Sequence, residues 1–156
     1  MLRFTHESLI PASPAEVFAF HARADAFELL QPPWDRVEIL RPPTGLEVGT
    51  QVELRVKVGP LWQRIVAQHV AFEPGRGFED VMVEGPFAHW HHRHRFVEHP
   101  DGCLLRDEIE YLPPGGVIGR WLDPLLVRPR LRRLFEYRHE VTRREVLAVQ
   151  GTAASA

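Results

Sequence analysis

The sequence predicts a single α+β domain in which a curved antiparallel sheet of about seven strands is closed by one long C-terminal helix. Residues 35–112 divide into strand-like runs separated by short turns rich in proline and glycine, whereas residues 129–149 follow a helical period. One amphipathic helix and a set of hairpin-linked strands share a core when the sheet curls and the helix covers its concave face. A cavity between helix and sheet is then expected, and such cavities commonly hold small ligands.

The N-terminal part predicts one strand followed by two short helices. Residues 2–10 alternate as a strand. Ser13 can cap a helix that begins at Pro14, and Glu16 occupies the capping-box position. Residues 25–30 repeat this pattern for a second short helix, which the following pair of prolines ends.

The remaining elements follow from alternation and turn residues. The strands expected after these helices cover residues 35–41, 51–58, 62–73, 78–84, 89–98 and 103–112. Residues 117–122 predict a short helical turn, and the long helix runs from Pro129 to about Val149. At about 1.5 Å per residue this helix reaches roughly 28 Å, which is enough to cross a small domain. The domain therefore covers residues 1–149, and residues 150–156 are expected to form a frayed tail.

Composition and charge exclude several classes of protein. Hydrophobic residues make up 44% and charged residues 26%, which is typical of a globular domain and not of a disordered chain. A formal net charge of -2 argues against a protein whose main partner is nucleic acid. Cys103 is the only cysteine, so no internal disulfide can form, and a reducing compartment fits best. With no apolar N-terminal segment and no run of membrane-spanning length, the sequence predicts a cytoplasmic protein without membrane insertion.

The most informative stretch is the strand at residues 89–99, which holds five of the nine histidines. Trp90, His92, His94 and Phe96 alternate on one face, which is aromatic and is expected to face the interior. The charged residues between them are expected to face water. This strand therefore supplies the candidate polar groups of the cavity.

The hairpin partner of this strand tests that assignment, because opposed residues lie on the same side of a sheet. A four-residue loop at 99–102 opposes His94 to Asp107, whereas a three-residue loop would oppose His94 to Glu108. Hydrophobic matching favours the first register. That register also opposes Phe96 to Leu105, His92 to Ile109 and Trp90 to Tyr111.

The pair of His94 and Asp107 has three interpretations. The two side chains can satisfy each other beneath the helix, they can bind a ligand carbonyl or hydroxyl, or they can act as a general acid–base pair. Burial and the carboxylate shift the pKa of the imidazole in opposite directions, so the sequence leaves its charge open. His92 and His94 could also chelate a metal ion, but no third ligand is evident, and no metal or cofactor is expected.

Other charged residues keep two interpretations each. Asp80 and Glu84 share one face of their strand, which either lines the cavity or is solvated. Arg138 falls on the apolar side of the long helix and either reaches an acidic ligand group or extends to the rim. Residues 128–133 carry four arginines, which could touch RNA, ribosomes or anionic lipid, although a solvated helix face is favoured.

Short motifs accompany this element order: SPAEVF at 13–18, GPF at 85–87 leading into the histidine-rich strand, and DEIEY at 107–111. Over residues 2–148 the chain resembles the helix-grip fold of the START, Bet v 1 and polyketide cyclase superfamily, called SRPBCC, and its run at 125–135 is similar to a branch of bacterial ligand-binding members. The resemblance implies binding of lipids, quinones, polyketides or hormones, and some members are cyclases or dehydratases. The quinone-binding and ribosome-associated branch has a Pro-Trp-Cys motif, from which this sequence departs with Pro-Pro-Trp at 32–34.

The function expected from these features is the binding of a small hydrophobic or aromatic metabolite, such as a lipid, quinone or polyketide, between sheet and helix. The alternatives are a cyclase or dehydratase that uses His94 and Asp107, and a ribosome- or RNA-associated regulator that uses the cluster Arg128–Arg133. A homodimer is compatible with the sequence. The expected lining consists of Val52, Leu54, Val56, Trp90, His92, His94, Phe96, Asp107, Ile109, Tyr111, Leu134, Phe135 and Arg138.

Overall fold

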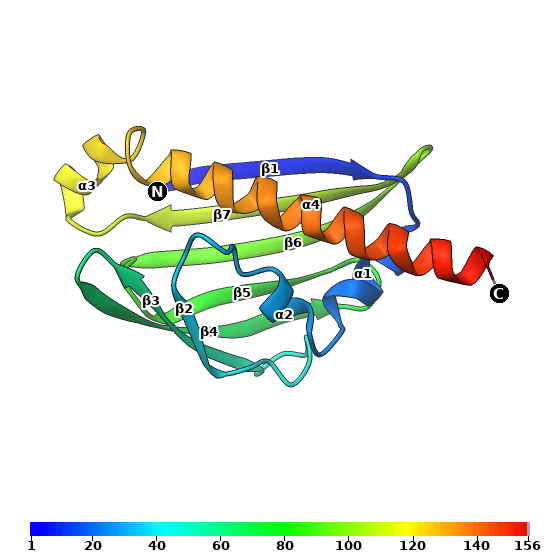
Figure 1. Ribbon diagram of the computed structural model, residues 1–156. Coiled ribbons are helices and arrows are strands. Elements are labelled where there is room, and N and C mark those ends of the chain that lie inside the picture. The colour runs from blue at the N-terminus through cyan, green and yellow to red at the C-terminus, as the bar shows by residue number, and fades with distance from the viewer. Residues whose placement is uncertain (156) are drawn as a thin grey trace.

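The computed structural model describes residues 1–155 and confirms the predicted fold class and element order (Figure 1). One strand, β1, precedes two short helices, six further strands follow, and two helices end the chain. The bounds are β1 Leu2–Ile10, α1 Pro14–His21, α2 Ala26–Leu29, β2 Val37–Arg41, β3 Gln51–Val58, β4 Leu61–Glu73, β5 Gly77–Glu84, β6 His89–His99, β7 Gly102–Leu112, α3 Gly116–Leu122 and α4 Val127–Ala154.

The strands form one antiparallel sheet in the order β1-β7-β6-β5-β4-β3-β2. Every pair of neighbouring strands except β1 and β7 is consecutive in the chain. The exception arises because the last strand, β7, lies beside the first. The sheet curves, and α4 crosses its concave side next to β1 and α1 (Figure 1). This is the arrangement in which one helix can share a core with a long antiparallel sheet.

The capping residues of α1 behave as predicted. The Ser13 hydroxyl accepts a hydrogen bond from the Glu16 backbone N–H at 3.3 Å, and the Glu16 carboxylate accepts one from the Ser13 backbone N–H at 2.8 Å. Pro14 occupies the first turn, where its missing N–H costs no helical hydrogen bond. The capped helix packs Val17 and Phe20 into the core.

The C-terminal helix is longer than predicted. It begins at Val127, two residues before Pro129, because a proline in the first turn interrupts no hydrogen bond of the helix. It also continues to Ala154, so residues 150–154 are helical where the sequence predicted a frayed tail. Gln150 donates a hydrogen bond to Glu16 at 3.0 Å, which joins this last part of α4 to α1.

The β6–β7 hairpin has the predicted register but a tighter turn. His94 lies opposite Asp107, and both strands extend to His99 and Gly102, which leaves a two-residue turn where a four-residue loop was predicted. Gly102 has a φ of +138°, and a Cβ there would lie 2.1 Å from the Ile10 carbonyl oxygen. Glycine is therefore required where this hairpin passes the end of β1.

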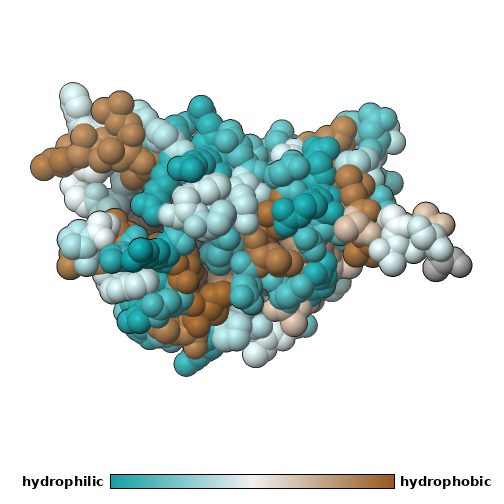
Figure 2. All heavy atoms as spheres, viewed as in Figure 1, coloured by the Kyte–Doolittle hydropathy of each residue, from teal (hydrophilic) through white to brown (hydrophobic). Residues whose placement is uncertain are grey.

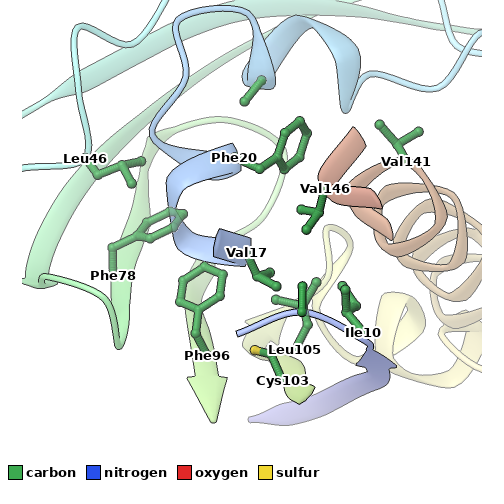
Figure 3. Close-up of a cluster of buried hydrophobic side chains, with 12 residues drawn as sticks. Ile10, Val17, Phe20, Leu46, Phe78, Phe96, Cys103, Leu105, Val141 and Val146 are labelled. Atoms are coloured by element: carbon green, nitrogen blue, oxygen red, sulfur yellow. The ribbon is translucent and has the colours of Figure 1, made fainter. Parts of the chain in front are cut away.

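Two apolar clusters fill the space between the sheet and the helices. The larger one lies where α1 meets the C-terminal half of α4, and includes Val17, Phe20, Phe78, Phe96 and Leu105 (Figure 3). The smaller one lies under the N-terminal half of α4 and consists of Phe4, Ile109, Tyr111, Leu131 and Phe135. On β7 these clusters are separated by a single inward residue, Asp107.

The α3 region carries apolar side chains that face solvent. Trp121 is 82% exposed, and Val117, Ile118 and Leu125 are each exposed by more than two thirds. These residues form the brown projection at one end of the molecule in Figure 2. No helix among residues 1–155 combines the length and the apolar character needed to cross a membrane.

Candidate functional site

Asp107 is the centre of a buried polar cluster on the inner face of β7. Its side chain is 4% exposed and lies against three imidazoles. His92 Nε2 and His94 Nδ1 each lie 2.7 Å from Asp107 Oδ1, and His139 Nε2 lies 2.6 Å from Oδ2. Burial alone would raise the pKa of Asp107, but the charge of His94 and the hydrogen bonds of His139 and His92 hold it well below its ordinary value.

His94 lies between two carboxylates. Its Nδ1 faces Asp107, and its Nε2 lies 3.5 Å from Asp80 Oδ2. Its ring stacks on Phe78 with centroids 4.0 Å apart. Burial would lower the pKa of His94, but the charges and hydrogen bonds of Asp107 and Asp80 together raise it to about 9. Both carboxylates therefore favour the charged form of this imidazole against the effect of burial.

His92 has the same two carboxylates as neighbours but the opposite pKa shift. Its Nε2 is hydrogen-bonded to Asp107, and its Nδ1 lies 3.5 Å from Asp80 Oδ2. Burial and the adjacent positive charge of His94 lower the pKa of His92 despite the two carboxylates. The two imidazoles are in contact, with ring centroids 3.8 Å apart.

Asp80 and Glu84 point in opposite directions. Asp80 is the register partner of His92 on the inner face, and its side chain is 15% exposed. Glu84 pairs with Arg64, and its side chain is 53% exposed. Of the two acids whose orientation the sequence left open, only Asp80 therefore joins the cluster.

Two histidines of this region were not predicted from the sequence. His139 of α4 reaches Asp107 with Nε2, and its Nδ1 lies 2.8 Å from the Ser8 hydroxyl. His139 could have been predicted from its spacing, because it follows Leu131 and Phe135 at intervals of four residues on one face of the helix. His69 lies on the inner face of β4, opposite Asp80 in the register, and is 6% exposed.

Arg138 is part-buried and makes contacts within the chain, and its contact with an acidic ligand group stays a prediction. Its Nε donates a hydrogen bond to the Leu30 carbonyl at 3.2 Å, and its guanidinium lies over the Phe135 ring. It is part-buried and joins α4 to the end of α2. Burial lowers its pKa, with Asp107 and Asp80 acting in the opposite direction.

Most large apolar residues of the predicted lining are part of the core. Phe96, Ile109, Tyr111 and Phe135 are each at most 4% exposed, while Trp90 and Leu134 are half-buried beside them. The Tyr111 hydroxyl donates a hydrogen bond to Asp123 at 2.7 Å. These four side chains support the site from behind and leave little surface for a ligand.

The two best-formed hollows of the described chain lie away from Asp107. The larger, of about 550 Å³, lies between the β5–β6 loop, the end of β7 and α3, and the smaller, of about 470 Å³, lies between Arg23 and the last turns of α4. The sequence predicted a cavity around His94 and Asp107. Around Asp107 the structure packs imidazole rings and Phe135, and a ligand cavity beside them stays a prediction.

The sequence profile of the polyketide cyclase / dehydrase and lipid transport family matches residues 10–135. The chain belongs to this family. The matched span includes Asp80, His92, His94 and Asp107 but ends before His139. No curated protein matches the sequence.

Solved structures with this fold come from bacteria and plants. TTHA0849 from Thermus thermophilus has 16% identity and a TM-score of 0.73, covering 95% of this chain and 99% of its own. Norcoclaurine synthase from Thalictrum flavum, in complex with dopamine and hydroxybenzaldehyde, has 16% identity and a TM-score of 0.70, covering 94% and 87%. The Zhui aromatase/cyclase from Streptomyces sp. R1128 has 18% identity and a TM-score of 0.61, covering 94% and 92%. At these identities the likeness shows the fold alone.

In this member of the polyketide cyclase / dehydrase and lipid transport family, α4 covers only part of the inner sheet face. It packs against β1 and α1, and β2–β4 lie beyond it (Figure 1). In Figure 2, hydrophobic residues reach the surface in the region below α4. The inner-face apolar side chains of β2–β5 that are only half-buried include Val37, Ile39, Leu54, Val56, Ile65 and Met82.

Proposed function

We propose that the protein binds a small, largely apolar or aromatic metabolite on the half of the inner sheet face that α4 leaves uncovered. The observation that carries this proposal is the row of half-buried apolar side chains on β2–β5, which includes Leu54, Val56 and Ile65. Contiguous apolar surface on a folded domain commonly marks a ligand or partner site. The family description, with cyclases and lipid transport, and the aromatic ligands of norcoclaurine synthase support this class of ligand.

The polar contacts of such a ligand would come from the side of the cluster nearest the apolar strands. Asp80 and His94 keep 15% and 13% of their side chains exposed, whereas His92 and Asp107 keep 4%. A carboxylate and an imidazole at one end of an apolar surface can orient a ligand hydroxyl or carbonyl. We therefore assign Asp80 and His94, rather than Asp107, as the residues that contact the ligand.

The enzymatic alternative has less support from the geometry. Asp107 is enclosed by three imidazoles and does not face the apolar strands. Both nitrogens of His94 lie near carboxylate oxygens, so neither is free to exchange a proton with a substrate in this arrangement. Binding without chemistry is the simpler use of such a cluster.

The ribosome or RNA alternative is also weakened, because the arginines it requires make contacts within the chain. Arg130 pairs with Asp35 at 2.8 Å, and the Arg133 guanidinium lies 4.1 Å from the centre of the Trp34 ring. Arg128 donates a hydrogen bond to the Arg3 carbonyl at 2.8 Å. These contacts give the arginines a role in holding α4 to the rest of the domain. The single cysteine supports a cytoplasmic location for the protein as part of this proposal.

Binding of the apolar fluorophore 1-anilinonaphthalene-8-sulfonate tests the proposal. The double variant Leu54→Ala, Ile65→Ala should weaken binding about tenfold, because each truncation removes apolar contact from the proposed surface. Val83→Ala removes an outward-facing side chain that is 58% exposed, and it should leave the affinity within about twofold of wild type. Trp121→Ser reports any dye bound at the exposed α3. If the double variant binds the dye as wild type does, or if Trp121→Ser alone abolishes binding, the proposal fails.

A further inference from the structure

We propose that Asp80, His92 and His94 form a binding site for one divalent transition-metal ion, with Zn²⁺ as the ion that this donor set suits best. The proposal concerns the cluster itself and holds whether or not an apolar ligand binds beside it. Two imidazole nitrogens and one carboxylate oxygen are a common protein donor set for zinc and for other first-row metals.

The spacing of the donor atoms fits a shared ion. His92 Nδ1 and His94 Nε2 each lie 3.5 Å from Asp80 Oδ2, and all three donor atoms lie within 4.8 Å of one another. Bonds of about 2.0–2.1 Å in a tetrahedral site place neighbouring donors about 3.3 Å apart. The two observed distances are longer than a normal hydrogen bond and close to this tetrahedral edge. Asp80 is therefore placed to share an ion with both imidazoles better than to hydrogen-bond either one.

Asp107 orients the two imidazoles toward Asp80. His92 Nε2 and His94 Nδ1 both lie 2.7 Å from Asp107 Oδ1, which leaves the opposite nitrogen of each ring directed at Asp80. A ligating histidine commonly gives its other nitrogen to a carboxylate, which fixes the ring and its tautomer. Asp107 is held in turn by His139, and His139 by Ser8, so the support extends through α4 to β1.

His69 provides a second, independent observation at the same place. It is the register partner of Asp80, it is 6% exposed, and its Nδ1 has no hydrogen-bond partner among residues 1–155. A buried nitrogen without a partner costs free energy unless something else occupies it. His69 thus adds a buried nitrogen without a partner beside Asp80, while the three converging donor atoms are those of Asp80, His92 and His94.

Access to the site is from the apolar half of the sheet. The side chains of Asp80 and His94 retain 15% and 13% exposure, whereas His92 and Asp107 are sealed beneath α4. A site with three protein ligands and one side toward solvent keeps a position for water or for a ligand oxygen. An ion held there would polarise a carbonyl or hydroxyl of a molecule on the adjacent apolar strands.

Titration of the chelator-treated full chain with Co²⁺ tests the proposal, because tetrahedral Co²⁺ gives intense visible absorption and replaces Zn²⁺ in such sites. We expect one Co²⁺ per chain, displaced by one Zn²⁺ as measured by elemental analysis. Asp80→Asn should weaken metal binding by more than the roughly 10- to 100-fold that follows loss of an outer carboxylate. The matched control is His91→Gln, which removes a histidine from the same strand whose side chain faces outward to Glu79, and it should bind as wild type does.

Two results would overturn the metal site. One is a wild-type chain that takes up no Co²⁺ or Zn²⁺ at equimolar concentration. The other is an Asp80→Asn chain that is folded by circular dichroism and binds metal as tightly as wild type. Dye binding to the metal-free chain tests the ligand proposal separately, since the apolar strands should bind the dye without any ion. A chain that binds the dye but no metal would therefore overturn only the metal site.

Discussion

The two halves of the inner sheet face differ in the side chains they carry and in how far α4 covers them. The half formed by β1, β7 and β6, which we call the sealed half, lies under α4 and buries a network of polar groups around Asp107. The half formed by β2–β5, the open half, carries the half-buried apolar side chains Leu54, Val56 and Ile65, although Val52 and Phe78 on it are buried. Both buried apolar clusters also draw side chains from β1, β6 and β7, so the two halves differ mainly in how far the helices cover them.

Most polar groups of the sealed half satisfy one another, whereas His94 Nδ1 lies 2.7 Å from Asp107 without a hydrogen-bond partner among residues 1–155. Asp107 uses both carboxylate oxygens, and His139 uses both ring nitrogens, one on Asp107 and one on Ser8. Apolar clusters flank the network on both sides, so water does not compete for these contacts. Buried polar networks of this kind are costly when one member is removed, which makes the comparison testable.

Asp107→Ala should have the largest effect, because it removes the hydrogen-bond partner of His92 and His139 and the carboxylate beside His94. We expect the free energy of unfolding to fall by roughly 3–5 kcal/mol, as measured by urea denaturation. The control is Glu108→Ala, one residue along the same strand but facing outward, which should cost less than about 0.5 kcal/mol. A loss below about 1 kcal/mol for Asp107→Ala would show that the network does not stabilise the sealed half.

Tyr111→Phe tests the other buried carboxylate of the sealed half and should cost roughly 1–3 kcal/mol. The variant removes only the hydroxyl that donates to Asp123, which is 2% exposed. Arg128 Nε lies 3.7 Å from the same carboxylate and retains part of the stabilisation, so the effect should be smaller than that of Asp107→Ala. Thermal denaturation of Tyr111→Phe beside Tyr137→Phe is the measurement, since the Tyr137 hydroxyl makes only a 3.4 Å contact with the Leu29 carbonyl. Equal losses in the two variants would contradict the importance of the buried carboxylate.

The sealed half could be predicted from the sequence better than the open half. The alternation of Trp90, His92, His94 and Phe96 fixed the inner face of β6, and hydrophobic matching with β7 fixed the register that places His94 opposite Asp107. Both signals come from side chains that are buried by the fold, which is why they are strong.

The rest of the site depends on features that leave little trace in the sequence. Asp80 alternates with valines, so β5 has no clear apolar face, and its inward side was undecided. Register shifts in β4 between Val66 and Ala67, and between His69 and Ala71, set which residues oppose Asp80. The face of α4 was assigned from its apolar residues, with Leu131, Phe135 and Val141 correctly on it, and His139 was missed because it is a polar residue within that buried stripe.

Leu54→Ala should have a small effect on stability, because the open half gains little from burying its apolar side chains. We expect a loss of less than about 1.5 kcal/mol, against roughly 3–5 kcal/mol for Phe135→Ala under α4. Urea denaturation of both variants measures the contrast. Similar losses would mean that the apolar strands are packed as tightly as the sealed core, and the two halves would not differ in the way described.

The reactivity of a cysteine in each half is the last comparison. It needs only one substitution with little effect on stability, and we expect a large difference in reaction rate between the two thiols. Cys103 is fully buried in the larger apolar cluster, and burial raises the pKa of its thiol to about 11. Because a raised thiol pKa removes thiolate at every pH below it, the reactive fraction at pH 8 falls about a hundredfold relative to a thiol with a pKa near 9. A cysteine introduced by Leu54→Cys on the open half should keep an ordinary pKa and be accessible. The Leu54→Cys chain should therefore react with a disulfide reagent in two phases, a fast one absent from wild type and a slow one shared with it. A wild-type Cys103 that reacts as fast as the introduced thiol would show that reagents enter the sealed half as easily as the open one.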